Sequence, residues 1–224
     1  MIKRLPWVSR GLAIWCKDLR IEFRTRYAYS ALLMFAFTTL VAVSFAVGGV
    51  VLDAGLAAAL LWVILFFAAM AGLSRTFVQE EEAGTVTALK LAARPEPVFI
   101  GKYLFNVTLL FSLAVLVVPL FLVLIHQTVA YPFPFLAVVL LGVAGLAGAS
   151  TIVAAIVARA GTRGPLMTVL AFPILLPLLL GAICGTRTCF AGERAVAADI
   201  LFLFCYNGAA LAVSLLLFPY VWDE

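Results

Sequence analysis

Residues 103–125 read YLFNVTLLFSLAVLVVPLFLVLI, and this stretch contains no Lys, Arg, Asp or Glu. An apolar run of about 20 residues is long enough to cross the hydrocarbon core of a bilayer as a helix. Five further charge-free runs of similar length can be marked, so the sequence predicts six transmembrane helices. The other five are residues 31–52, 55–73, 135–158, 166–183 and 200–221.

The distribution of charge supports this interpretation. None of the 15 basic and 11 acidic residues falls inside the six runs, although one Arg or Lys at the centre of a spanning helix costs about 2.5–3.5 kcal/mol on insertion scales. The chain is 66% apolar and only 12% charged, which is too little charge to cover a soluble domain. We therefore predict an all-α membrane protein. Five spans with a re-entrant segment are the alternative.

The basic residues also predict an orientation. Thirteen of the 15 lie in the amino-terminal tail, in residues 75–102 or in residues 159–163, and only Arg187 and Arg194 fall on the other side. Basic residues collect on the cytoplasmic side of membrane proteins. We expect both termini to be cytoplasmic, and we expect no cleaved signal segment because charges are spread evenly through the first 30 residues.

Residues 1–30 form the first part of the predicted organisation, and residues 31–224 form the six-helix domain. Residues 9–29 predict an amphipathic helix that lies flat in the inner headgroup layer. A basic tail with no mechanical role is the alternative. The apolar side chains at steps of three and four are Leu12, Trp15, Leu19 and Phe23.

The longest soluble segment between spans is residues 74–102. It holds a helical-looking stretch, then a corner that we expect at Arg94 to Pro97, because proline disfavours helix in the residue before it. We expect its acidic part to couple the chain to a separate ATPase, with a solvated, passive connector as the alternative. The residues concerned are Glu80, Glu81, Glu82, Gly84 and Thr85.

Several motifs are absent. A phosphate-binding loop requires a glycine five residues before its Gly-Lys pair, but Glu96 stands there before Gly101 and Lys102. We therefore expect no ATP hydrolysis by this chain and no enzymatic activity of its own. The sequence contains no zinc-protease motif and no c-type haem attachment motif, and we predict no metal site.

Three side chains on the predicted external side have more than one interpretation. His126, at the end of the third run, could be an axial haem ligand, or it could be an ordinary polar end-group. Cys184 and Cys189 fall in a predicted external loop before the sixth run, where they could form a disulfide, serve as a thiol pair for a metal, or remain two free thiols.

Small residues and prolines mark two of the runs. In residues 135–158 the small side chains of Ala144, Gly145, Gly148 and Ala149 predict close helix packing, with substrate passage as the alternative. Pro173 and Pro177 predict a kinked or broken fifth helix, which could act as a hinge or serve packing.

Further stretches carry a resemblance to a known family. In residues 73–102 they are Arg75, Phe77, the acidic run, Gly84-Thr85, Leu89, Pro95 and Gly101-Lys102, and they are joined by RGPLMTVL at 163–170 and FPILLPL at 172–178. From about residue 10 to the end, the chain resembles the haem-exporter permease family of cytochrome c maturation, whose members are ABC-2-type permeases.

The resemblance implies an ABC-2-type permease half in the bacterial inner membrane. It implies a partner ATP-binding subunit that holds ATP and magnesium, a haem-handling subunit, a small further subunit, a haem chaperone and a second copy of this chain. No cofactor is expected in this chain, although the complex would handle haem. An ABC-2-type exporter half for a lipid or drug, or a haem-binding membrane protein, remains the alternative.

Overall fold

The computed structural model describes residues 7–73, 76, 77, 80, 84–92, 94–159, 165–193 and 196–223. The regular structure within these residues is helical. The helices are α1 (Trp7–Thr25), α2 (Tyr27–Val47), α3 (Ala54–Leu73), α5 (Val86–Ala92), α6 (Pro95–Leu124), α7 (Pro132–Arg159), α8 (Pro165–Ala191) and α9 (Val196–Asp223).

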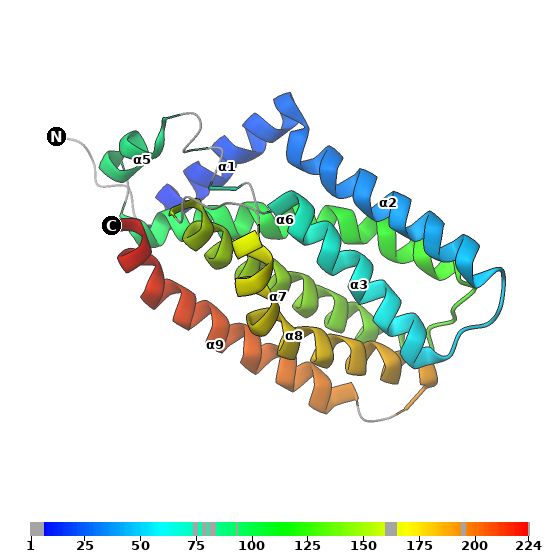
Figure 1. Cartoon of the computed structure of the whole chain (residues 1–224). Coiled ribbons are helices and arrows are strands. Elements are labelled where there is room, and N and C mark those ends of the chain that lie inside the picture. Colours follow the sequence, from blue (N-terminus) through cyan, green and yellow to red (C-terminus); the bar gives the residue numbers. More distant parts are fainter. Residues whose placement is uncertain are drawn as a thin grey trace.

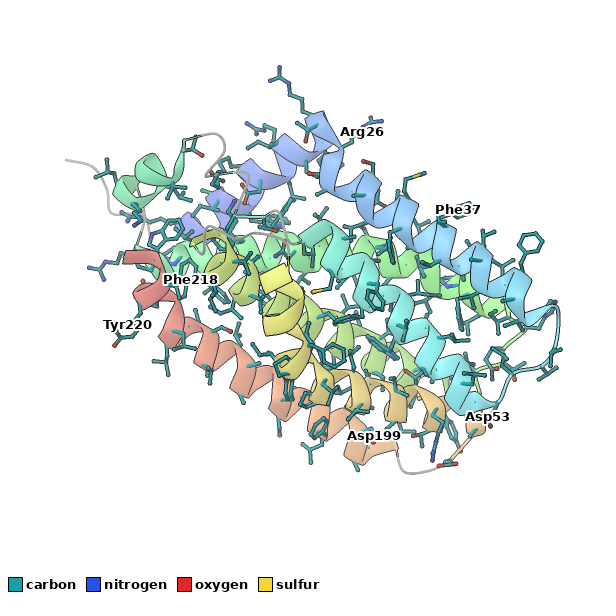
Figure 2. All side chains as sticks on the ribbon, in the orientation of Figure 1. Arg26, Phe37, Asp53, Asp199, Phe218 and Tyr220 are labelled. Carbon is teal, nitrogen blue, oxygen red and sulfur yellow. The ribbon has the colours of Figure 1, made fainter. Side chains whose placement is uncertain are left out.

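Six of these helices, α2, α3 and α6 to α9, are long and apolar enough to cross a membrane. The predicted all-α class and the six spans are therefore confirmed. The spans run up and down, so the start of α1, α5 and the end of α9 lie at one end of the bundle (Figure 1). Asp53 and Asp199 mark the opposite end (Figure 2).

The first two spans are connected differently from the prediction. We expected the first helix to continue to residue 52, but α2 ends at Val47 because Gly48 and Gly49 have φ of 60° and 80°, a conformation that terminates helices. Asp53 lies just before α3 and caps its first turn, since its carboxylate accepts a hydrogen bond of 2.8 Å from the N–H of Gly55. The connection is residues 48–53 rather than two residues.

Helix α6 begins earlier than the charge-free run suggested. Arg94 is extended, with φ −68° and ψ 160°, and Pro95 occupies the first turn, where a missing N–H costs nothing. The expected corner from Arg94 to Pro97 therefore ends before Pro95. As a result, Glu96 and Lys102 belong to the first turns of a spanning helix.

Helix α7 is the centre of the bundle and packs against α3, α6, α8 and α9 (Figure 1). Its glycines permit this close contact. A Cβ atom on Gly142 would lie 2.0 Å from the ring of Trp62, and one on Gly145 would lie 2.5 Å from the side chain of Leu178. Gly148 is less tight, because a Cβ there would lie 3.4 Å from Tyr103.

Helix α8 is not broken by its two internal prolines, Pro173 and Pro177, and runs as a helix to Ala191. Proline removes a backbone hydrogen bond from the preceding turn. In that turn the carbonyl of Ile174 accepts a hydrogen bond from the hydroxyl of Tyr206 on α9. The carbonyl that Pro177 leaves without a donor is that of Pro173, so this bond links α8 to α9 one residue beyond it.

Candidate functional site

Helix α1 lies directly on the first turns of α6. A Cβ atom on Gly101 would lie 2.8 Å from the carbonyl oxygen of Gly11 and 2.8 Å from the Cβ of Ile14. Such distances are shorter than van der Waals contact, so this close approach requires glycine at position 101, whereas a Cβ on Gly11 would lie 3.4 Å from the Pro97 carbonyl oxygen, an ordinary contact. This crossing fixes where the rest of α1 falls.

The buried face of α1 overlaps only in part with the predicted apolar side chains, of which Trp15 and Leu19 are partly buried against the core. The helix expected over residues 9–29 exists, but it ends at Thr25, and the face packed on the bundle is made by Gly11, Ile14, Asp18 and Glu22. Leu12 and Phe23 are 44% and 77% exposed. The two acidic residues on the inner face were not among the predicted site residues.

Asp18 faces a buried lysine. The Nζ of Lys102 lies 2.9 Å from the Oδ2 of Asp18 and 2.8 Å from the Oε1 of Glu80. It also donates a hydrogen bond of 3.3 Å to the carbonyl of Thr76. The Lys102 side chain is only 3% exposed, and a buried ammonium is tolerated only when it is paired and hydrogen-bonded.

Lys17 is the second cation of this group. Its Nζ lies 2.5 Å from the Oε1 of Glu80 and 3.3 Å from the Oδ1 of Asp18, and 40% of the side chain is exposed. Two ammonium groups therefore face two carboxylates, and the formal charges cancel. We call Lys17, Asp18, Glu80 and Lys102 the charge cluster.

Glu80 is held by its own loop as well. The Thr85 hydroxyl donates to the Oε2 of Glu80 at 2.5 Å, and the Thr85 N–H donates to its carbonyl at 3.0 Å. Burial raises the pKa of Glu80, but the charge and hydrogen bond of Lys102, with help from Lys17 and Thr85, outweigh burial and lower the pKa to about 2. Glu80 is therefore ionised at neutral pH.

The pKa of Lys17 moves in the opposite direction. Burial lowers the pKa of Lys17, but its hydrogen bond to Glu80 and its attraction to Asp18 and Glu80 more than compensate and raise it. Both groups are thus stabilised in their charged forms. The cluster is a set of ion pairs.

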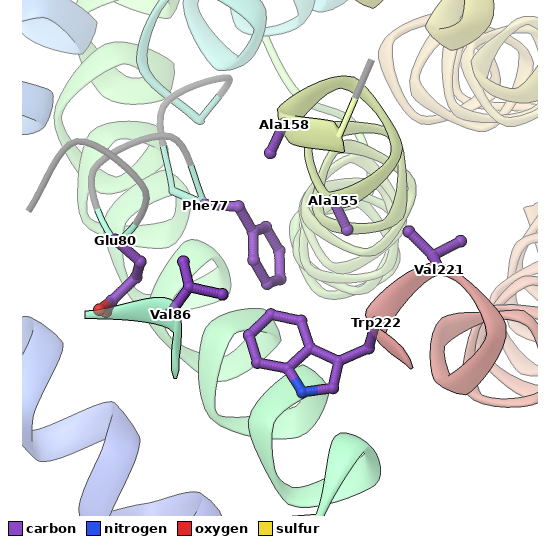
Figure 3. A pocket seen from close by; sticks show the side chains of 7 residues that line it. All are labelled: Phe77, Glu80, Val86, Ala155, Ala158, Val221 and Trp222. Carbon is purple, nitrogen blue, oxygen red and sulfur yellow. The ribbon is translucent and has the colours of Figure 1, made fainter. Parts of the chain in front are cut away.

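An aromatic layer lies beside the charge cluster. The ring of Phe77 is 5.8 Å from that of Phe218 and 6.2 Å from that of Trp222, and Phe218 is 5.2 Å from Phe99. Figure 3 shows Phe77 between α7 and Trp222, beside Val86 of α5. A cavity of about 30 Å³ remains here. The layer joins the segment after α3 to the start of α6 and the end of α9.

Polar side chains continue from this layer into the bundle. The Thr76 hydroxyl donates to the Asn106 side-chain oxygen at 2.9 Å, and the Asn106 amide donates to the Thr151 hydroxyl at 2.8 Å. Asn106 and Thr151 are completely buried. This series of hydrogen bonds was not predicted from the sequence, although Asn106 is visible as a polar residue inside an apolar run.

Comparison with known protein families identifies the sequence that carries these features. The model of the CcmB protein family matches residues 10–222, which is nearly the whole chain. The chain belongs to the CcmB family. The family comprises haem-exporter permeases, so this is a membrane permease component of the haem-export ABC system of cytochrome c maturation, in which ATP-binding and other subunits take part. A search of curated proteins found no match.

The predicted coupling residues of this CcmB-family chain are divided by the structure. Glu80 is 7% exposed and points into the charge cluster. Gly84 and Thr85 are exposed, and Gly84 has φ 66°, so it forms a turn before α5 rather than part of a helix. Glu81 and Glu82 lie outside the described residues. Glu80 therefore points into the bundle, and its role in coupling stays a prediction.

The residues predicted on the external side are not brought together. His126, the one histidine in the sequence, is exposed in the connection after α6, with φ 55°. Cys184 and Cys189 lie within α8 rather than in the expected loop, both as free thiols. Five residues along a helix separate them by about 140°. No group of three metal-ligating side chains occurs among the described residues.

Proposed function

We propose that this chain couples ATP hydrolysis by a separate subunit to haem delivery or to release of a haem-loaded chaperone. The charge cluster is the observation that supports this proposal. It joins α1, the segment after α3 and the start of α6 through buried ion pairs. Movement of that segment would therefore also move a spanning helix.

The surface that contacts the ATP-binding subunit and receives its movement would be α5 and the turn before it. Leu91 of α5 is 87% exposed, and Thr85 and Arg94 are exposed beside it in the chain. An exposed apolar side chain on a helix suits a hydrophobic groove on a partner protein. We propose that α5 enters such a groove on the ATP-binding subunit, in place of the acidic residues first expected there.

Transmission depends on how firmly the segment is held. Removal of one partner from a buried ion pair costs about 3–5 kcal/mol because a buried charge is left unpaired. The aromatic layer adds contacts between Phe77 and α9. Displacement of α5 would therefore pull on α6 and α9 together rather than stretch a loose loop.

We propose that the α1 and α5 end of the bundle lies on the cytoplasmic side of the bacterial inner membrane. The distribution of basic residues supports this orientation, since Arg187 is the one described basic residue at the opposite end. The described basic residues at the α1 and α5 end are Arg10, Lys17, Arg20, Arg24, Arg26, Lys90, Arg94, Lys102 and Arg159.

The proposed assembly contains two copies of this chain and two ATP-binding subunits, together with the haem-handling subunit, which is joined by the small one. The haem chaperone would receive haem at the external face. ATP and magnesium would be bound by the ATP-binding subunits. Haem would be the cargo of the complex, and a single exposed imidazole at His126 gives this chain no axial pair with which to hold it.

A first experiment tests the function itself. A strain that lacks this chain is complemented with the wild type, and covalent haem attachment to c-type cytochromes is measured by haem staining. We expect attachment to be lost without the chain and restored with it. Normal cytochromes in the deletion strain would refute the function.

A second experiment tests the docking surface. Leu91→Asp places a charge where we expect an apolar contact, and Leu91→Met keeps the contact as a matched control. Membrane insertion is confirmed, and co-purification of the ATPase is compared. We expect Leu91→Asp to lose both the ATPase and cytochrome assembly, and Leu91→Met to retain both. Unchanged co-purification in Leu91→Asp would show that α5 is not the docking surface.

A further inference from the structure

A hollow of about 520 Å³ lies beneath the elbow between α1 and α2, against α6. This volume is within the range of small-molecule sites, about 300–1,000 Å³. Its walls are mainly apolar, and a few polar groups lie among them. The lining residues are Leu19, Glu22, Phe23, Arg26, Tyr29, Ser30, Leu33, Thr108, Leu109 and Ser112.

The elbow above the hollow is fixed by its backbone conformation and by two hydrogen bonds. Arg26 has φ 53°, a left-handed conformation between two helices, and its N–H donates to the carbonyl of Glu22 at 2.6 Å. The Glu22 carboxylate is 6% exposed and accepts a hydrogen bond of 2.8 Å from the N–H of Tyr29 in the first turn of α2. The Glu22 carboxylate is thus hydrogen-bonded to the backbone of α2, while the Arg26 side chain remains exposed at the rim of the hollow.

We propose that this hollow binds one anionic phospholipid. Its phosphate would lie against the guanidinium of Arg26, and an acyl chain would run along Leu33 and Leu109. A guanidinium matches phosphate oxygens with two parallel hydrogen bonds. Figure 2 shows Arg26 at the outer corner of the elbow, above the start of a spanning helix. A headgroup and the beginning of an acyl chain would meet the protein at this depth.

Haem is another anionic amphiphile, but the lining suits it less well. Haem carries two carboxylates and an iron that is usually held by His, Cys or Met. The hollow has none of these three, and Tyr29 is its one side chain of a type known to bind haem iron. Arg26 is its one cation. One cation and an apolar wall are sufficient to bind a single phosphate and an acyl chain.

Retention of lipid by the full-length chain tests the proposal. The protein is purified from membranes that contain phosphatidylglycerol and phosphatidylcholine, and bound lipid is measured by native mass spectrometry. Arg26→Asn removes the charge while keeping a residue that tolerates a left-handed backbone. Ser112→Trp fills the hollow from α6. The matched controls are Arg20→Asn, an exposed cation elsewhere on α1, and Leu116→Trp, one turn further on α6.

We expect the wild type and both controls to retain phosphatidylglycerol in preference to phosphatidylcholine. Arg26→Asn should lower phosphatidylglycerol retention about fivefold, which corresponds to about 1 kcal/mol for one basic residue at a membrane surface. Ser112→Trp should lower it at least as much, and Arg26→Lys should retain only part of it, because an ammonium keeps the charge but cannot make two parallel hydrogen bonds. Circular dichroism of each variant confirms that the helices are intact.

Three results would overturn the proposal. Equal retention in Arg26→Asn, Ser112→Trp and their controls would show that the hollow holds no lipid. Equal retention of the two phospholipids would show that Arg26 recognises no charge. Displacement of phosphatidylglycerol by hemin, with an absorbance band that Tyr29→Phe removes, would assign the hollow to haem. The test needs no cytochrome assembly, so its failure is distinct from failure of the proposed coupling role.

Discussion

The Nζ of Lys102 lies 2.8 Å from the Oε1 of Glu80, and the two side chains expose only 3% and 8% of their surface. Glu80 follows α3, whereas Lys102 belongs to α6. The same ammonium reaches Asp18 on α1 at 2.9 Å. One buried cation therefore joins three separate parts of the chain, and the charge balance around it can be tested.

Neutralising Glu80 and Lys102 together should cost less than the two single changes added together. Glu80→Gln leaves two ammonium groups facing one carboxylate, and Lys102→Gln leaves the reverse. We expect each to destabilise the protein by about 3–5 kcal/mol. The double variant leaves Lys17 with Asp18 and restores neutrality, so it should lose less than the sum of the single variants. The apparent thermal midpoint in detergent measures this.

Arg20→Gln, an exposed position on α1, is the control and should change the midpoint little. Additive losses in the double variant would show that Glu80 and Lys102 do not act as a pair. That result would also remove the main support for a rigid connection between the segment after α3 and α6.

Gly101→Ala should loosen α1. The added Cβ would lie 2.8 Å from the Gly11 carbonyl and from the Ile14 side chain, so one helix must move away. Trypsin should then cut faster within α1, which carries Lys17, Arg20 and Arg24. Gly208→Ala on α9 is the control, because a Cβ there meets nothing within 4 Å. Equal cleavage rates in the two variants would contradict the close crossing.

Acid should weaken the charge cluster through Glu80. Its pKa falls from an ordinary 4.5 to about 2 in the folded chain, so the unfolded chain binds more protons between these values. The stabilisation is complete above pH 4.5 and is lost as the pH falls toward 2. The thermal midpoint of the wild type should therefore drop more between pH 5 and pH 3 than that of Glu80→Gln. Parallel drops would show that Glu80 does not carry the effect.

The proposed orientation can be checked with single cysteines. Leu91 on α5 and Thr128 after α6 are both exposed and lie at opposite ends of the bundle. In a chain whose four natural cysteines are replaced by serine, an impermeant maleimide added to intact cells should label Thr128→Cys and spare Leu91→Cys. Labelling of Leu91→Cys from outside would reverse the orientation.

The spans could be predicted because the bilayer acts on each segment separately. Any run such as residues 103–125 must be apolar along its whole length and satisfy its own backbone, so the signal is local. The end of α2 was misplaced because Gly48 and Gly49 are apolar and yet adopt left-handed conformations. Hydropathy does not register that change.

The charge cluster was missed because its members are far apart in sequence. Asp18 is one of several charges on an amphipathic helix, and Lys102 looks like the flank of a span. The close crossing of α1 and α6 at Gly101 brings them together, and the sequence does not show it. The predicted loop at Cys184 and Cys189 was wrong for a related reason, since Thr186 and Thr188 bond to Trp62 and to the Cys184 carbonyl and so remain within α8.

The contact between α1 and α6 has a consequence for biogenesis. Asp18 leaves the ribosome when neither Glu80 nor Lys102 has been synthesised, so its carboxylate has no buried partner at that stage. Until the third span is inserted, α1 has the hydrogen bond from the Tyr29 N–H to the Glu22 carboxylate and the bilayer surface, on which exposed Leu12 and Phe23 can rest. We therefore expect α1 to bind lipid before it packs on α6, and its two different faces to serve these two stages.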